Sequence, residues 1–194
     1  MNEMPEHQRL RADIATSDRG SLIGSIISGA FGVAWGFWGS SGLPDFAALC
    51  IQVAASLLGL VIVIAAVRRL TRTARDGGPA RGRTLFSSRA YVIIVVAEVL
   101  AIVGGNLVLT GTEQSQFRIA LVSAVVGLHF LFFGRLFWRG FYWLGAALLA
   151  SAAVGAVVGV ISGDANLILA IVGCGSAASL FAAAAPALLR RVVY

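Results

Sequence analysis

The chain has 194 residues, of which 58% are hydrophobic and only 12% charged, and its formal net charge is +6. A soluble domain usually carries about 25% charged residues. Here the apolar residues come in blocks of about 20, the length of helix that crosses a bilayer core about 30 Å thick. The composition therefore excludes a soluble domain and predicts an integral membrane protein.

The polar N-terminal segment comes first in the chain. Residues 1–20 carry charges of both signs and predict a cytoplasmic tail. After Pro5 this tail has the pattern of a short helix with Leu10 and Ile14 on one face, which would lie on the membrane surface. A frayed, solvated tail is the alternative, and the sequence leaves both open.

Six apolar blocks follow and predict an all-α bundle of six transmembrane helices within residues 21–191. The expected spans are about 21–39, 46–67, 90–109, 117–136, 141–161 and 165–189. The basic residues lie between these blocks, so we interpret them as signs of topology and expect no nucleic-acid partner.

Arginines set the expected orientation. They gather in the tail, in the loop 68–89, around Arg135 and Arg139, and at the C-terminus, whereas the opposite loops hold only Arg118. By the positive-inside rule, both termini are expected in the cytoplasm. The loop 68–89 is most simply a determinant of orientation, and a patch for anionic lipid is the alternative. Arg135 and Arg139 are expected to reach lipid phosphates, beside a belt of aromatic residues.

Small residues recur every four positions in two of the predicted spans, which places them on one helical face. Such stripes let two helices approach closely in lipid. The pattern predicts helix packing, either within the chain or against a second copy or another membrane protein. The residues concerned are Gly24, Ser28, Gly32 and Gly36 in the first span, and Ser151, Gly155 and Gly159 in the fifth.

Glu98 and His129 are the only Glu and His inside the predicted spans. Glu98 lies about 13 Å along its helix from Arg89, and His129 about 9 Å from Arg135, on neighbouring antiparallel spans. An acid in lipid usually faces the bundle, and histidine titrates near neutral pH. The pair therefore indicates a proton relay or a cation site. The alternative is two structural residues, each bonded to a neighbouring hydroxyl or carbonyl group.

Other polar residues inside the spans extend this hypothesis. Ser28, Ser56 and Asn106 would line a proton, ion or substrate path if they converged on Glu98 and His129. Serine is also common as a packing residue in membrane helices, where it bonds back to its own backbone. The chain has no zinc-protease, phosphate-loop or nucleophile-elbow motif, so we expect no enzyme, metal or cofactor.

The segment Gly127-Leu-His-Phe-Leu-Phe-Phe-Gly-Arg-Leu-Phe137 resembles a family of bacterial six-span proteins called domain of unknown function 7010. Their fourth span has a small residue, then His-Leu-Leu-Pro, then Leu-Tyr and a short basic turn. His129 matches the motif histidine and Leu136-Phe137 the Leu-Tyr pair, whereas Phe132 stands in place of the proline. The resemblance implies six spans in the bacterial cytoplasmic (inner) membrane, points to His129, and brings no known activity.

Two functions remain open at this point. The first is a small proton-linked transporter or channel that uses Glu98 and His129. The second is an accessory or scaffold subunit of a membrane complex, with the small-residue stripes binding a partner. The lipid bilayer is the expected surrounding in both.

Overall fold

The computed structural model describes residues 6–75, 89–136 and 139–189, with side chains for 20–72, 89–136 and 139–185. The described part is all-helical and contains six helices long and apolar enough to cross a membrane, which confirms the predicted six-span α-helical class. They are α1 (Glu6–Ser40), α2 (Asp45–Arg75), α3 (Arg89–Gly111), α4 (Arg118–Leu136), α5 (Gly140–Ser162) and α6 (Ala165–Leu189), with a short 3-10 turn, η2 (Ser115–Phe117), before α4.

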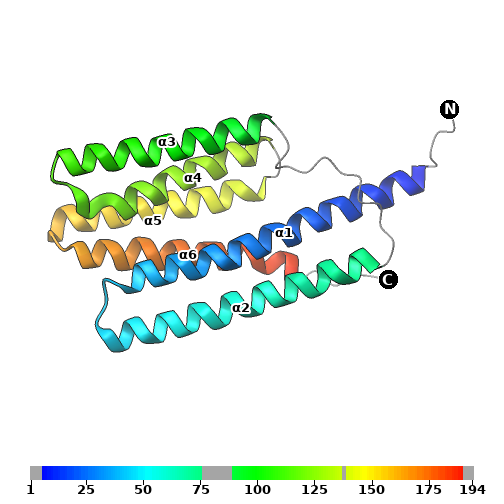
Figure 1. Ribbon diagram of the computed structural model, residues 1–194, viewed down its shortest axis with the longest axis horizontal. Coiled ribbons are helices and arrows are strands. Elements are labelled where there is room, and N and C mark those ends of the chain that lie inside the picture. Colours follow the sequence, from blue (N-terminus) through cyan, green and yellow to red (C-terminus); the bar gives the residue numbers. More distant parts are fainter. Residues whose placement is uncertain (1–5, 76–88, 137–138, 190–194) are drawn as a thin grey trace.

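The helices pack in the order α2, α1, α6, α5, α4, α3, and each is antiparallel to its neighbour (Figure 1). Helix α6 sits at the centre and also contacts α2 and α4. The side chains with the least exposure gather around it, among them Ile168, Val172 and Leu180. Helices α2 and α3 therefore lie at opposite edges of the bundle.

Helices α1 and α2 are longer than the predicted spans. They have 35 and 31 residues, or about 52 and 46 Å, against a bilayer core of about 30 Å. Helix α1 begins at Glu6, so the polar N-terminal segment continues the first span as one helix, and α2 continues past Val67 to Arg75. Arginine is a good helix former, so the backbone need not unwind where the apolar block ends. Both extensions project at the same end of the bundle (Figure 1).

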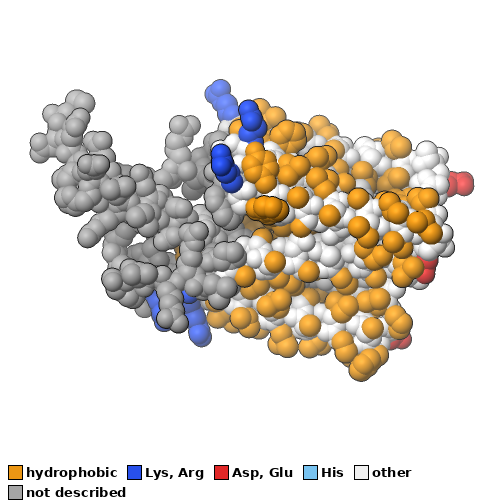
Figure 2. Space-filling model, turned by 180° about the vertical axis from the view of Figure 1, so that it is seen from behind, with side chains coloured by type: hydrophobic (Ala, Val, Ile, Leu, Met, Phe, Trp, Pro, Cys, Tyr) orange, Lys and Arg blue, Asp and Glu red, His pale blue; other side chains and the backbone are white. Residues whose placement is uncertain are grey.

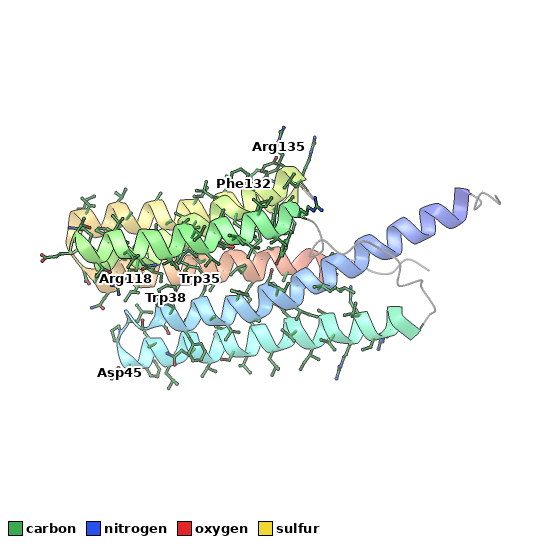
Figure 3. All side chains as sticks on the ribbon, turned by 45° about the horizontal axis from the view of Figure 1, so that its top comes forward. Trp35, Trp38, Asp45, Arg118, Phe132 and Arg135 are labelled. Carbon is green, nitrogen blue, oxygen red and sulfur yellow. The ribbon has the colours of Figure 1, made fainter. Side chains whose placement is uncertain are left out.

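The two ends of the bundle differ in charge (Figure 2). One end, here called the arginine end, carries the exposed or half-exposed side chains of Arg68, Arg69, Arg72, Arg89, Arg135 and Arg139. The other, the acidic end, carries Asp45, Glu113 and Asp164, together with Arg118. Asp45 and Arg118 lie at one end of Figure 3 and Arg135 at the other. The helical surface between them is apolar, as expected for a membrane-spanning protein.

Glycines set the closest helix contacts. Helices α1 and α6 cross at Gly39 and Gly173, where a Cβ atom on Gly39 would lie 2.6 Å from the backbone nitrogen of Cys174. Helices α4 and α5 meet in the same way at Gly127 and Gly145, where a Cβ atom on Gly145 would lie 2.6 Å from the carbonyl oxygen of Gly127. The predicted stripes did not include these four glycines, because they do not repeat at four-residue intervals along one helix.

The predicted small-residue stripes mostly contact other helices of the same chain. Gly32 lies against Phe181 and Gly36 against Ala55, so these two glycines bring α1 close to α6 and α2. On α5, the three stripe residues face α6: Ser151 lies against Gly175, Gly155 against Val172 and Gly159 against Ile168. Ser28 is half-buried, and the Cβ position of Gly24 is open, with no neighbouring atom within 4 Å.

A serine pair ties three helices together in the core. Ser123 of α4 and Ser176 of α6 have no exposed surface, and their hydroxyl oxygens lie 3.0 Å apart. The Ser123 hydroxyl also donates to the carbonyl oxygen of Leu148 on α5, at 3.0 Å. Hydrogen bonds between membrane helices each stabilise by about 0.6 to 2 kcal/mol.

We expect Ser123→Ala to lower the free energy of unfolding by about 1 kcal/mol, because both contacts of its hydroxyl join α4 to other helices. Ser179→Ala is the matched control, since the Ser179 hydroxyl donates to Gly175 of its own helix. Reversible unfolding in mixed detergent micelles measures both. An equal loss in the two variants would contradict an interhelical role for Ser123.

Candidate functional site: an acid and a histidine between α3 and α4

The structure brings Glu98 and His129 into contact. The segment 112–117 joins α3 to α4, so the two helices run antiparallel and side by side. The Nδ1 atom of His129 lies 2.8 Å from Oε2 of Glu98. The His129 side chain keeps only 11% of its surface exposed, and the Glu98 side chain keeps 18%. An acid and a base therefore meet within the membrane-spanning part of the chain.

The contact is close but not aligned as a hydrogen bond. The distance is that of a charge-assisted bond. Nevertheless, Nδ1 is buried and makes no hydrogen bond of good angle with any group in the described residues. The Glu98 oxygen thus lies off the direction of a hydrogen bond to Nδ1, and the contact is a close approach of an acid and a base in an imperfect orientation. A small rotation of either side chain would align the bond or release it.

Aromatic rings surround the histidine on its arginine-end side. The His129 ring lies 4.0 Å from the ring of Phe133, one turn along α4, and 5.4 Å from that of Phe130, centre to centre. Phe133 in turn stacks on Tyr91 of α3 at 5.6 Å, and Phe130 stacks on Phe141 of α5 at 5.6 Å. These rings separate the acid–histidine pair from the arginines at the membrane boundary.

The aromatic belt expected from the sequence includes Phe130, Phe133 and Phe141 but not Tyr91. Tyr91 shows no helical spacing to His129 because it comes from another helix. Phe133 does carry a signal, since it follows His129 by four residues and so lies on the same face of α4. That spacing alone does not distinguish a residue that contacts the histidine from one that faces lipid.

Helix α3, which carries Glu98, is attached to the bundle along one side only. None of its residues is fully buried, and its main contacts are with α4 and η2. Large apolar side chains such as Ile93, Leu100 and Leu107 are 66–69% exposed. Movement of α3 relative to α4 would therefore break the Glu98–His129 contact, the Tyr91–Phe133 stack and the hydrogen bond from Arg118 to Thr110, but it would expose no fully buried residue of α3.

The other residues expected on a polar path do not join the pair. Ser28 is on α1. Ser56 is on α2, which lies at the opposite edge of the bundle from α3 (Figure 1). Asn106 shares α3 with Glu98, but it lies two turns further along and donates to the carbonyl oxygen of Ile102 at 2.8 Å. The described structure thus brings together two of the five residues.

The predicted lipid-facing residues lie at the arginine end. Arg135 and Arg139 are both exposed there, at the end of α4 and before α5. Of the basic loop 68–89, residues 76–88 lie outside the described part, whereas Arg68, Arg69 and Arg72 belong to the last turns of α2. Within the described residues, no three His, Cys, Asp or Glu side chains gather closely enough to hold a metal ion.

Comparison with known proteins gave no match: no family model, no curated protein and no solved structure corresponds to this chain. The resemblance of the segment around His129 to a bacterial six-span family remains an expectation.

Proposed function

We propose that this protein is a small proton-linked transporter or channel, in which Glu98 and His129 form the proton-binding site. The observation that carries the proposal is the 2.8 Å contact between the two side chains inside the membrane-spanning bundle. Ionisable side chains are costly in a bilayer and usually mark the path of an ion or a substrate. A structural role alone would be served by apolar residues at lower cost.

The chemistry of the pair supports proton binding. When both groups are charged, carboxylate and imidazolium attract each other across α3 and α4. A proton taken up by Glu98, or one lost from His129, leaves a single charge on the pair, and the attraction between opposite charges disappears. Because no aligned hydrogen bond joins the pair and α3 packs on one side only, the loss of this attraction would weaken the contact between α3 and α4 and favour movement of α3. Proton uptake would thus move α3 and change the access of solvent to the Glu98–His129 pair.

The proposed setting is the cytoplasmic membrane of a bacterium, with the arginine end in the cytoplasm. The clustering of arginines at one end of the bundle supports this orientation. Both termini would then be cytoplasmic, and Glu98 would lie nearer the cytoplasmic face. Arg135, Arg139 and the basic loop 68–89 would lie beside the anionic headgroups of that face.

We expect Glu98→Gln to reduce proton flux at least tenfold in liposomes that contain only this protein. The amide keeps the shape of the side chain but cannot take up a proton in this pH range. A pH-sensitive dye inside the liposomes measures the flux after an outside pH step, with potassium and valinomycin compensating the charge. Glu113→Gln is the matched control, because it makes the same chemical change in an exposed residue at the acidic end.

Equal proton flux in wild type and Glu98→Gln would contradict the proposal. Flux no greater than that of empty liposomes would favour the second candidate, a non-transporting accessory subunit. The exposed apolar face of α3 favours that candidate, because a partner helix packing there would cover the least buried span of the bundle. Chemical crosslinking from α3 in native membranes would then recover one fixed partner.

A further inference from the structure

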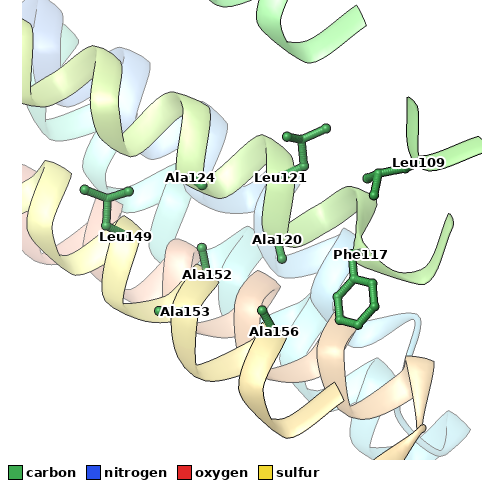
Figure 4. A pocket seen from close by; sticks show the side chains of 9 residues that line it. All are labelled: Leu109, Phe117, Ala120, Leu121, Ala124, Leu149, Ala152, Ala153 and Ala156. Carbon is green, nitrogen blue, oxygen red and sulfur yellow. The ribbon is translucent and has the colours of Figure 1, made fainter. Parts of the chain in front are cut away.

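An open apolar groove runs along the bundle near its acidic end (Figure 4). It has a volume of about 410 Å³ and lies where α4 and α5 pack together, with Leu109 of α3 at one side. Five alanines from α4 and α5 line it, together with Leu109, Phe117, Leu121 and Leu149. Small side chains leave this hollow because a methyl group does not fill the space between two helices.

The groove lies within one leaflet. It runs from Phe117 of η2 along α4 to Ala124, and along α5 from Ala156 back to Leu149, which is about 10 Å on each side. It therefore begins at the acidic boundary and occupies roughly a third of a 30 Å hydrocarbon core. Ala153, which lines it, is exposed, so the groove opens to the surrounding lipid.

A cation lies beside the boundary end of the groove. Arg118 directly follows Phe117, and its guanidinium donates to the Thr110 hydroxyl at 2.8 Å, where Thr110 directly follows Leu109. Arg118 is exposed, and no described carboxylate lies within ion-pair distance of it. One of its five N–H donors is thus used, and the others remain available for phosphate oxygens.

We propose that this groove binds one phospholipid of the leaflet at the acidic end, with an acyl chain against the alanines and the phosphate on Arg118. The groove and a phospholipid match in both polarity and charge. The apolar groove would hold the acyl chain, and the guanidinium at its boundary end would hold the phosphate. Arg118 stands at the end that is otherwise acidic, so a role in orienting the protein does not explain it. The proposal is independent of the Glu98–His129 pair.

Native mass spectrometry of the purified, delipidated protein titrated with phosphatidylglycerol tests the site. Wild type is expected to bind one lipid with preference over further adducts. Ala153→Phe, which fills the groove, and Arg118→Gln, which removes the charge, should each weaken that first binding about tenfold, or about 1.4 kcal/mol. Ala146→Phe is the matched control, two turns away on the same face of α5, exposed, and outside the groove. It should bind as wild type does.

Two further ligands separate the parts of the proposal. A diacylglycerol with the same chains lacks the phosphate, so it should bind wild type about tenfold more weakly and be insensitive to Arg118→Gln. Inorganic phosphate alone should neither bind nor compete. Equal phosphatidylglycerol binding in all four proteins would overturn the site, as would diacylglycerol binding as tight as that of phosphatidylglycerol. Full competition by inorganic phosphate would replace the lipid with a free anion. Since Arg118 is exposed, its variant tests the site even if Ala153→Phe does not fold.

Discussion

Gly173→Leu is expected to destroy the folded bundle, with a loss of about 3 kcal/mol or more in the free energy of unfolding. The Cβ atom of the new side chain would collide with the Cα and backbone nitrogen of Gly39 on α1. A flexible side chain would yield to such a collision, whereas a helix backbone moves only as a whole. Helix α1 would have to separate from α6, and Gly32 would lose its contact with Phe181.

Fluorescence-detected gel filtration and thermal unfolding in detergent would measure this loss. Gly173→Ala is expected to show the same defect to a smaller degree, because it adds only the Cβ atom. Gly104→Leu is the matched control: it lies on exposed α3, and no atom lies within 4 Å of its Cβ position. A Gly173→Leu protein that unfolds at the wild-type temperature would show that α1 and α6 do not cross at this point.

Removal of His129 alone is expected to lower the free energy of unfolding of the bundle by about 2 to 3 kcal/mol. In His129→Leu, the Glu98 carboxyl group faces an apolar interface without the imidazole that it contacts in the wild type. A partly buried polar group that loses its partner is costly, so the folded state is destabilised.

A double-mutant cycle isolates the interaction within the pair. Glu98→Leu/His129→Leu leaves neither polar group, so it should recover most of the stability that His129→Leu loses. Glu98→Leu alone leaves the imidazole without its partner and completes the cycle. Reversible unfolding of the four proteins in mixed detergent micelles gives the coupling energy, expected at about 1 to 3 kcal/mol. Additive losses would show that the two groups do not interact.

The pair also marks how far a sequence can predict a site. The depths of Glu98 and His129 followed from helix rise alone, because a span must begin and end at the membrane boundaries. Their contact requires Glu98 to face α4 and His129 to face α3, and the hydropathy of these two helices does not specify which face each turns to the other. Ser28 and Ser56 illustrate the limit, since they satisfy the same polarity rule but lie on helices away from α3.

The sequence by itself determined the class of this protein, its six spans and the charge difference between its ends. Each of these follows from the cost of placing polar groups in hydrocarbon, which acts on every segment separately. Only the tertiary structure decided which helices are neighbours, that Gly39 meets Gly173, and that Ser123 and Ser176 join the core. Hydrophobicity does not select partners among apolar helices in lipid, because lipid tails are as apolar as leucine. The close fit of small residues and a few hydrogen bonds make that selection, and they depend on the three-dimensional position of single side chains.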